Sequence, residues 1–384
     1  MDISPGEFQA LGLYDPDSEE AEDRLALLQF LVDHGVEVSE MQEADRDGRL
    51  HVLAVEGLLR PRTRRMTLQE AADQLRVSPD MCLRIWRALG FADPDLDEEV
   101  FSESDVEMMG LLPTAMRLGI DIDELLHAGR IIGSSMARIA EAEVALLRAN
   151  VEAPLRAAGA GDFVVARTLA GLVGEVLPRI STLIEGVHRQ HLDIAARSQV
   201  FMDIEGGYDT ADVTIGFADL MDFTAWSEKL APSELSSAIA SYEERVSDTV
   251  VAGGGRIVKF IGDGVMFAAD ELEAGCEVAL RLIESFNWDP VLPPMRIGVA
   301  AGEAIKREGD YYGPVVNLAS RIVDVALPRS VLVSNDVADR LDSSVGDDEL
   351  PSYLTKRVGA HKLKGIGSVQ LYVLRRERRS RQRD

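Results

Sequence analysis

Apolar residues in the first half of the chain recur at helical spacings. Between residues 25 and 199 they stand three and four positions apart, and runs that alternate between apolar and polar residues are few. Spacings of three and four place apolar side chains on one face of a helix, whereas a strand alternates. The pattern predicts an α-helical N-terminal domain over residues 1–165.

Residues 67–91 have the pattern of two short helices joined by a turn. Thr67 stands at a cap position with Glu70 three residues later, and a Val-Ser-Pro turn precedes a second amphipathic stretch. Helix-turn-helix units that read DNA share this order. Four arginines lie just upstream: Arg60, Arg62, Arg64 and Arg65. The alternative, which the acidity of the chain favours, is a packed helical hairpin without a ligand.

Residues 166–207 are predicted to form a helical stalk and linker. Apolar residues here follow spacings of 4, 3, 4, 3 and 4, the repeat that pairs helices along a seam. They are Leu169, Val173, Val176, Ile180, Leu183 and Val187. Pro178 interrupts the repeat, and we expect it to bend or break the helix because proline removes one backbone hydrogen bond. Packing within the subunit and pairing in a coiled coil both fit this pattern.

The pattern changes at residues 205–209, and beyond them strand-like and helix-like segments alternate. The predicted strands are 212–218, 256–261, 265–269, 295–301, 331–333 and 370–374, and the predicted helices are 232–251, 272–286 and 315–325. The second and third strands would form a hairpin around Gly262-Asp263-Gly264. This order predicts an α+β domain over residues 208–374, followed by a basic tail at 375–384.

Composition restricts the function of the chain. Its 384 residues suffice for two domains, and its net charge of −26 argues against general binding of nucleic acid, whose phosphates it would repel. Cys82 and Cys276 are far apart, so neither a disulfide framework nor a zinc site is indicated. No apolar run reaches the roughly 18 to 20 residues that a membrane span requires, and no signal peptide is visible. We expect a cytoplasmic protein.

Two carboxylates stand at the ends of apolar strands. Asp219 follows the strand at 212–218, and Asp263 occupies the tip of the predicted hairpin. Taken singly, each is an ordinary turn former. Together, with Lys259 as the only nearby basic residue, they offer hard oxygen ligands for Mg²⁺, which completes its shell with phosphate and water.

Other segments carry groups that suit a nucleotide. Asn317 and Arg321 are four apart on a predicted helix and share one face, where an amide and a guanidinium suit a phosphate or a sugar. An arginine pairing on a solvated face is the alternative. Lys364 precedes Gly365 and Gly367 in a turn that would place its ammonium on a terminal phosphate.

These segments together resemble the class III nucleotidyl cyclases. The resemblance covers about 170 residues, with the motifs in the family's order and spacing. It implies a ferredoxin-like βαββαβ core, two divalent metal ions (Mg²⁺ or Mn²⁺), and a homodimer with active sites in the interface. The whole chain resembles actinobacterial soluble adenylate cyclases, in which a helical domain regulates conversion of ATP to 3′,5′-cyclic AMP and responds to a small-molecule or proton signal, such as lipid or pH.

The resemblance assigns metal and base contacts. Asp219 and Asp263 match the two metal carboxylates. Lys259 and Asp310 match the pair that reads the base, since an ammonium can donate to adenine N1 and a carboxylate can accept from the N6 amine. Guanine presents a carbonyl and a ring N–H in those places, so the pair is expected to select ATP.

It also assigns ribose and phosphate contacts. Asn317 matches the residue that orients the ribose, Arg321 the one that stabilises charge on the α-phosphate, and Lys364 the one that binds the terminal phosphates. Two departures are visible: Asp222 stands where glycine is usual, and residues 311–314 form an unusual Tyr-Tyr-Gly-Pro run.

A different function class is a nucleotide-sensing, DNA-binding regulator that uses residues 67–91. Such a protein has no reason to keep both metal carboxylates, the base pair and the Asn/Arg pair, yet all are present. The related diguanylate cyclases would show a GGDEF-type hairpin in place of Ile-Gly-Asp-Gly.

Overall fold

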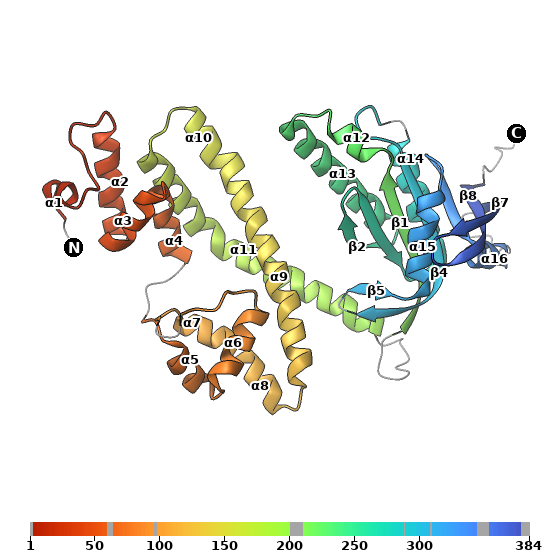
Figure 1. Cartoon of the computed structure of the whole chain (residues 1–384), viewed down its shortest axis with the longest axis horizontal. Coiled ribbons are helices and arrows are strands. Elements are labelled where there is room, and N and C mark those ends of the chain that lie inside the picture. The colour runs from red at the N-terminus through yellow and green to blue at the C-terminus, as the bar shows by residue number, and fades with distance from the viewer. Residues whose placement is uncertain are drawn as a thin grey trace, which may run out of the picture. The chain divides into compact units, whose positions relative to one another are not determined.

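The computed structural model describes residues 3–59, 64–95, 98–199, 210–287, 289–307, 309–343 and 353–377. It divides into two compact units, Met1–Ala195 and Ala196–Asp384, coloured red to yellow-green and green to blue in Figure 1. Residues 205–209, where the sequence pattern changes, lie outside the described residues.

The first unit is helical, as its apolar spacing predicts. Its α-helices are α1 (Pro5–Ala10), α2 (Ala21–Asp33), α3 (Val38–Arg46), α4 (Leu53–Leu59), α5 (Leu68–Leu75), α6 (Pro79–Ala88), α7 (Glu103–Met109), α8 (Leu111–Arg117), α9 (Ile122–Leu147), α10 (Ala153–Ala157) and α11 (Asp162–Gln199). A 3₁₀ turn (Leu50–Val52) precedes α4, and a π-helical turn (Arg148–Glu152) joins α9 to α10. A core that includes Leu28, Leu31 and Ala166 packs α2 against α11.

Helices α5 and α6 form the predicted helical pair. The Thr67 hydroxyl accepts from the Glu70 N–H at 3.4 Å, and the Glu70 carboxylate accepts from the Thr67 N–H at 3.0 Å, so the predicted capping box is confirmed. Ser78 caps α6 through its hydroxyl, which accepts from the Met81 N–H at 3.2 Å. Arg60 and Arg62 lie outside the described residues. DNA binding by helices α5 and α6 stays a prediction.

The sequence predicts a bend or a break of the helix at Pro178, and α11 continues through it, so a break is wrong. A break would create two new helix ends, each with four backbone groups lacking a helical partner. Proline within the helix removes only one hydrogen bond. The hydroxyls of Ser181 and Thr182 donate to the carbonyls of Leu177 and Pro178 at 3.2 and 3.1 Å, within the turn that follows the ring.

The second unit is built on one mixed sheet. Its strands are β1 (Thr210–Leu220), β2 (Arg256–Ile261), β3 (Gly264–Ala269), β4 (Met295–Arg307), β5 (Asp310–Tyr312), β6 (Val331–Ser334), β7 (Tyr353–Leu363) and β8 (Gly367–Arg376). Their order is β2-β3-β1-β4-β6-β8-β7, with β5 paired to β4. The helices are α12 (Phe223–Ser227), α13 (Pro232–Ala252), α14 (Leu272–Phe286), α15 (Pro314–Val325) and α16 (Asn335–Ser343). The α+β prediction is confirmed, and β5, β7, α12 and α16 are additions to it.

The two faces of the sheet are covered by different helices. Ala218 and Leu220 of β1 pack in a core with residues of α13, α14 and α16. Val213 and Ile215, of opposite parity on the same strand, pack in a second core with α15. Because residues of one parity share a face, we call these the α13 face and the α15 face.

Two glycines bring helices close to the sheet. A Cβ on Gly298 of β4 would lie 2.3 Å from the backbone nitrogen of Val323 in α15. A Cβ on Gly275 of α14 would lie 2.4 Å from Cγ2 of Thr214 in β1. Helices α15 and α14 can therefore pack this close to the sheet because these two positions have no side chain.

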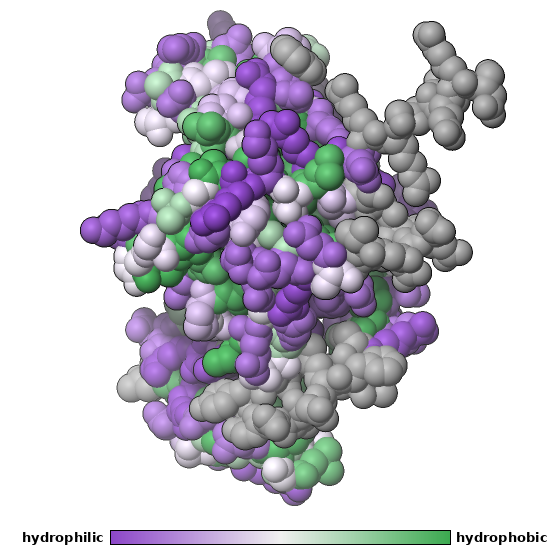
Figure 2. All heavy atoms as spheres, turned by 90° about the vertical axis from the view of Figure 1, so that its right-hand side faces the viewer, coloured by the Kyte–Doolittle hydropathy of each residue, from purple (hydrophilic) through white to green (hydrophobic). Residues whose placement is uncertain are grey.

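The surface is mostly polar on the face that Figure 2 presents, where hydrophilic residues (purple) separate small groups of hydrophobic ones (green). Across the described residues, none of the helices combines the length and the apolar composition that crossing a bilayer requires.

Candidate active site

The structure brings Asp219 and Asp263 together. Asp219 lies near the end of β1, directly opposite Gly264, the first residue of β3, and Asp263 precedes that glycine in the hairpin turn. Burial raises the pKa of the Asp263 carboxyl above its ordinary value, and the adjacent negative charge of Asp219 raises it further. Two carboxylates that repel one another at the end of a buried strand favour a cation between them.

Arg296 is a site residue that sequence reasoning missed. It stands directly opposite Asp219 on β4, and its Nε and Nη2 donate to Oδ2 of Asp219 at 2.9 and 2.6 Å. Only the pairing register of β1 with β4 would have revealed it, because the two residues are 77 positions apart.

Lys259 and Asp310 form an ion pair, although 51 positions separate them. Lys259 comes from β2 and Asp310 begins β5, which folds back on β4. Asp310 Oδ2 accepts from the lysine ammonium, and its Oδ1 accepts from the Tyr311 N–H at 2.8 Å. The structure therefore places a donor and an acceptor side by side.

Asn317 and Arg321 are exposed on α15, and Arg321 donates to the Asp324 carboxylate at 3.1 Å. Lys364 is exposed in the turn between β7 and β8, next to Leu363, which is buried in the core that α15 shares. Within the described ranges, no hydrogen bond or ion pair joins these three side chains directly to the two carboxylates. Arg321 is linked to Asp219 only indirectly, because Arg296, which binds Asp219, also donates to the carbonyl of Asp324.

The two departures from the family pattern have simple structural consequences. Asp222 takes a left-handed conformation (φ 54°) before α12, a conformation that aspartate tolerates better than most residues. Tyr311 is buried, and the guanidinium of Arg256 lies 5.1 Å from its ring centroid. The aromatic residue thus anchors the short strand β5 that presents Asp310.

The residues present fit divalent metal ions of the Mg²⁺ type. Asp219 and Asp263 supply two carboxylates, and among the described residues there is no cluster of three or more His, Cys, Asp or Glu side chains that would form an all-protein cage. Mg²⁺ commonly binds through one or two carboxylates together with substrate phosphates. Burial raises the pKa of both thiols, Cys82 to about 11 and Cys276 to about 12, which makes them poor metal ligands at neutral pH.

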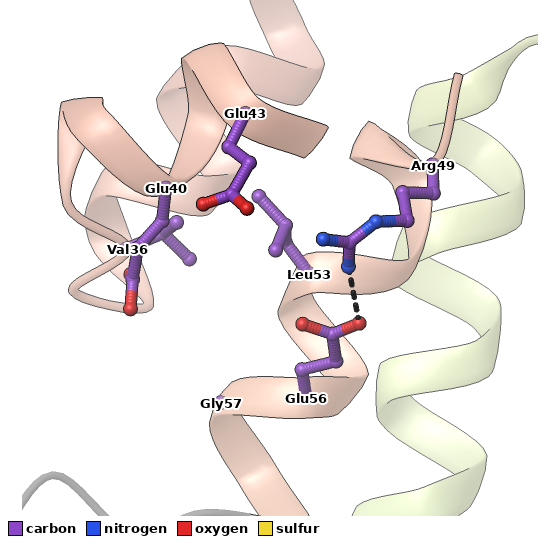
Figure 3. A pocket seen from close by; sticks show the side chains of 7 residues that line it. All are labelled: Val36, Glu40, Glu43, Arg49, Leu53, Glu56 and Gly57. Carbon is purple, nitrogen blue, oxygen red and sulfur yellow. Dashed lines mark hydrogen bonds and ion pairs between the residues drawn. The ribbon is translucent and has the colours of Figure 1, made fainter. Parts of the chain in front are cut away.

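The helical unit contains two further hollows. Figure 3 shows a polar pocket of about 180 Å³ in which Arg49 donates to Glu56 at 3.0 Å, beside Glu40 and Glu43. Its three glutamates would repel a triphosphate. An apolar groove of about 590 Å³ lies between α4, α9 and α11 and has His188 at its edge.

Comparison with known proteins agrees with this division. Residues 9–213 match the adenylate cyclase regulatory domain, and residues 207–376 match the adenylate and guanylate cyclase catalytic domain. An uncharacterized protein of Mycobacterium tuberculosis, Rv2212, is 34% identical over 336 residues, covering 87% of this chain and 86% of the relative.

Two relatives carry functional names. A protein of Streptomyces coelicolor named adenylate cyclase is 32% identical, over 75% of each chain. A protein of M. tuberculosis named pH-sensitive adenylate cyclase is 27% identical, over 92% of this chain and 88% of the relative. The chain therefore belongs to the class III nucleotidyl cyclases, enzymes of the phosphorus–oxygen lyase type, and joins an adenylate cyclase regulatory domain to a cyclase catalytic domain.

Proposed function

We propose that this protein converts ATP to 3′,5′-cyclic AMP and pyrophosphate. The observation that carries the choice of ATP is the Lys259–Asp310 pair. Adenine offers an acceptor at N1 and a donor at N6, which complement an ammonium and a carboxylate. Guanine offers the opposite polarity at both positions and would leave both side chains without a partner, which costs binding energy.

In the proposed reaction, the 3′-hydroxyl attacks the α-phosphorus in line and expels pyrophosphate. Divalent ions held by Asp219 and Asp263 would lower the pKa of the hydroxyl and neutralise phosphate charge. Arg321 stabilises the charge that develops on the α-phosphate, and Lys364 binds the departing pyrophosphate. Asn317 orients the ribose, which keeps the attacking oxygen aligned.

We propose that two copies of the chain build two equivalent sites. Asp219 and Asp263 would serve one site, while the base-reading pair, Asn317, Arg321 and Lys364 serve the other. What supports this arrangement is that neither Arg321 nor Lys364 makes a direct hydrogen bond or ion pair with the two carboxylates among the described residues. The alternating burial of β2, with Lys259 and Ile261 exposed, leaves strand surface for a partner. A two-fold interface generates both sites from the same contacts.

Identification of the product tests the reaction. The purified chain would be incubated with Mg²⁺ or Mn²⁺ and either ATP or GTP, and the products separated by chromatography. Cyclic AMP from ATP, with little cyclic GMP from GTP, is the expected result. If neither nucleotide yields a cyclic product, the proposed reaction is wrong.

Mixing inactive variants tests the shared sites. Asp219→Ala and Arg321→Ala should each be nearly inactive, because each lesion is present in both sites. In their heterodimer one site carries both lesions and the other carries neither, so a statistical mixture should regain about a quarter of wild-type activity.

A matched control uses two lesions from the same half-site. Asp219→Ala mixed with Asp263→Ala leaves one lesion in each site of the heterodimer, so no activity should return. Equal recovery in the two mixtures, or none in either with subunit exchange demonstrated, would contradict the shared-site dimer.

We further propose that the helical unit regulates catalysis. The match of residues 9–213 to a regulatory domain supports this, as does the pH-sensitive relative. The apolar groove and His188 at its edge offer a place for a small apolar molecule or a proton to act. Residues 166–207 would transmit the signal, and the two free cysteines suit a cytoplasmic location.

A further inference from the structure

Arg296 binds one oxygen of Asp219 and leaves the other available. Its Nε and Nη2 both donate to Oδ2, at 2.9 and 2.6 Å, and the two side chains are only 23% and 26% exposed. Oδ1 lies 3.7 Å from the point where a Cβ would stand on Gly264. The second oxygen therefore faces the hairpin that carries Asp263.

The same guanidinium is also held by the helix that carries Asn317 and Arg321. Nη1 of Arg296 donates to the Asp324 carbonyl at 3.1 Å, close to the C-terminal end of α15. Helix C-termini attract cations because their last carbonyls are unpaired. The Asp324 side chain in turn accepts from Arg321 at 3.1 Å. A continuous polar chain thus runs from Asp219 through Arg296 and Asp324 to Arg321.

This arrangement fixes the carboxylate in direction and in charge. Arginine stays protonated in proteins, so the positive charge beside Asp219 does not depend on pH or on a bound metal. That charge lowers the repulsion between Asp219 and Asp263. Three donors in a planar fork also restrict rotation of the guanidinium, which a lysine with a single nitrogen would not do.

The geometry points to Arg296 as a positioning residue that presents Oδ1 of Asp219 to the catalytic metal ions. This inference rests on the proposed function of Asp219 as a metal ligand. Groups that hydrogen-bond metal-ligating carboxylates change metal affinity by about 10- to 100-fold when they are removed. Arg296 is expected to fall in that range because it supplies both bonds to Oδ2.

Direct metal binding tests the inference without relying on turnover. Free Mn²⁺ would be measured by electron paramagnetic resonance during titration of the full-length chain, with a non-cyclisable 3′-deoxy ATP analogue present. Arg296→Gln should weaken Mn²⁺ binding about 10- to 100-fold, and Arg296→Lys should fall between that variant and the wild type. Asp219→Ala marks the loss expected when the ligand itself is removed.

Arg340 provides the matched control. It also pairs with an aspartate of β1, donating from Nη1 and Nη2 to the two oxygens of Asp212 at 2.6 and 3.2 Å, but that aspartate is more exposed and lies seven residues before Asp219. Arg340→Gln should leave Mn²⁺ binding unchanged. If loss of any arginine pair on β1 weakened Mn²⁺ binding through a general structural effect, Arg340→Gln would weaken it as well.

Two results would overturn the inference. Mn²⁺ binding by Arg296→Gln at wild-type affinity would show that Asp219 needs no positioning, and tighter binding would show that Arg296 competes with the metal. Should Arg296→Gln fail to fold, as judged by circular dichroism, wild-type affinity in Arg296→Lys would overturn the inference equally. Failure of the proposed reaction is distinguishable, because it is the absence of cyclic product in a wild-type chain that still binds Mn²⁺ through Asp219.

Discussion

Replacement of Gly298 by alanine should displace the helix that carries Asn317 and Arg321. The added Cβ would lie 2.3 Å from the Val323 nitrogen, 2.7 Å from the Ala319 oxygen and 2.9 Å from the Ile322 carbonyl carbon. Ordinary contacts of a carbon atom begin at about 3.5 Å, so α15 must retreat by about 1 Å. All three contacts are backbone atoms, which no change of rotamer can move.

This shift of α15 should lower both the stability of the fold and the catalytic rate. Overpacking by one methyl group costs about 1 to 3 kcal/mol of stability. Misplacement of a catalytic group by about 1 Å can cost about 100-fold in rate. We therefore expect Gly298→Ala to remain folded at low temperature while kcat falls about 100-fold.

Gly275→Ala separates displacement of the catalytic helix from general destabilisation. Its Cβ would lie 2.4 Å from Thr214 Cγ2, a comparable overlap, but α14 carries none of the predicted site residues. Stability would be measured by thermal unfolding and kcat at saturating ATP well below the melting temperature. Gly6→Ala, at an exposed position of α1 with no atom within 4 Å, should leave kcat unchanged and raise stability by at most about 1 kcal/mol, because alanine favours a helix more than glycine does. Equal losses of kcat in Gly298→Ala and Gly275→Ala would refute the argument that the position of α15 against the sheet sets the active-site geometry.

Three further predictions concern charge. Lys259→Glu combined with Asp310→Cys should lower ATP use and shift selectivity toward GTP, and unchanged ATP turnover would remove these residues as base readers. Burial and the Asp219 charge raise the pKa of Asp263, so its ionised form destabilises the metal-free fold above that pKa. Asp263→Asn should therefore raise the melting temperature in EDTA at pH 7.5, by an amount that shrinks toward about pH 4. A gain in melting temperature that does not depend on pH would contradict the charge argument. Replacement of His188 and His191 by alanine should bring the ratio of activity at pH 8 to activity at pH 6 closer to one, and an unaltered ratio would exclude them as the proton sensor.

Local signals in the sequence predicted most of the secondary structure. The capping box of Thr67 and Glu70 involves residues three positions apart, so its geometry is contained in the sequence itself. The strands that begin at Arg256 and Met295 are apolar runs bounded by turn residues, and they form as predicted. Strand β7 was missed because its sequence mixes charged, polar and apolar residues and only its last residue, Leu363, is buried, which removes the apolar signal.

In the candidate site, too, the sequence predicted local features and missed those that depend on strand pairing. Motifs located Asp219 and Asp263 individually, whereas their contact depends on the pairing of β1 with β3, which no spacing along the chain encodes. Arg296 was missed for this reason, since its relevance arises from register with a strand 77 residues earlier. Pro178 failed as a break signal because the rule for proline describes one hydrogen bond and ignores the cost of two new helix ends.

Strand β1 connects the start of the catalytic unit to Asp219. Its 11 residues begin at Thr210, the first described residue after helix α11, and Asp219 lies near its far end. Hydrogen-bonded partners flank it on both sides, with β4 paired along its whole length and β3 along its second half. A force applied at Thr210 is therefore shared across the sheet, and it cannot stretch or turn the strand enough to move Asp219 alone. In the proposed homodimer, a regulatory signal that enters at this end would then move the catalytic unit as a rigid body, so we expect it to change how the two subunits meet and to leave the geometry within each subunit intact.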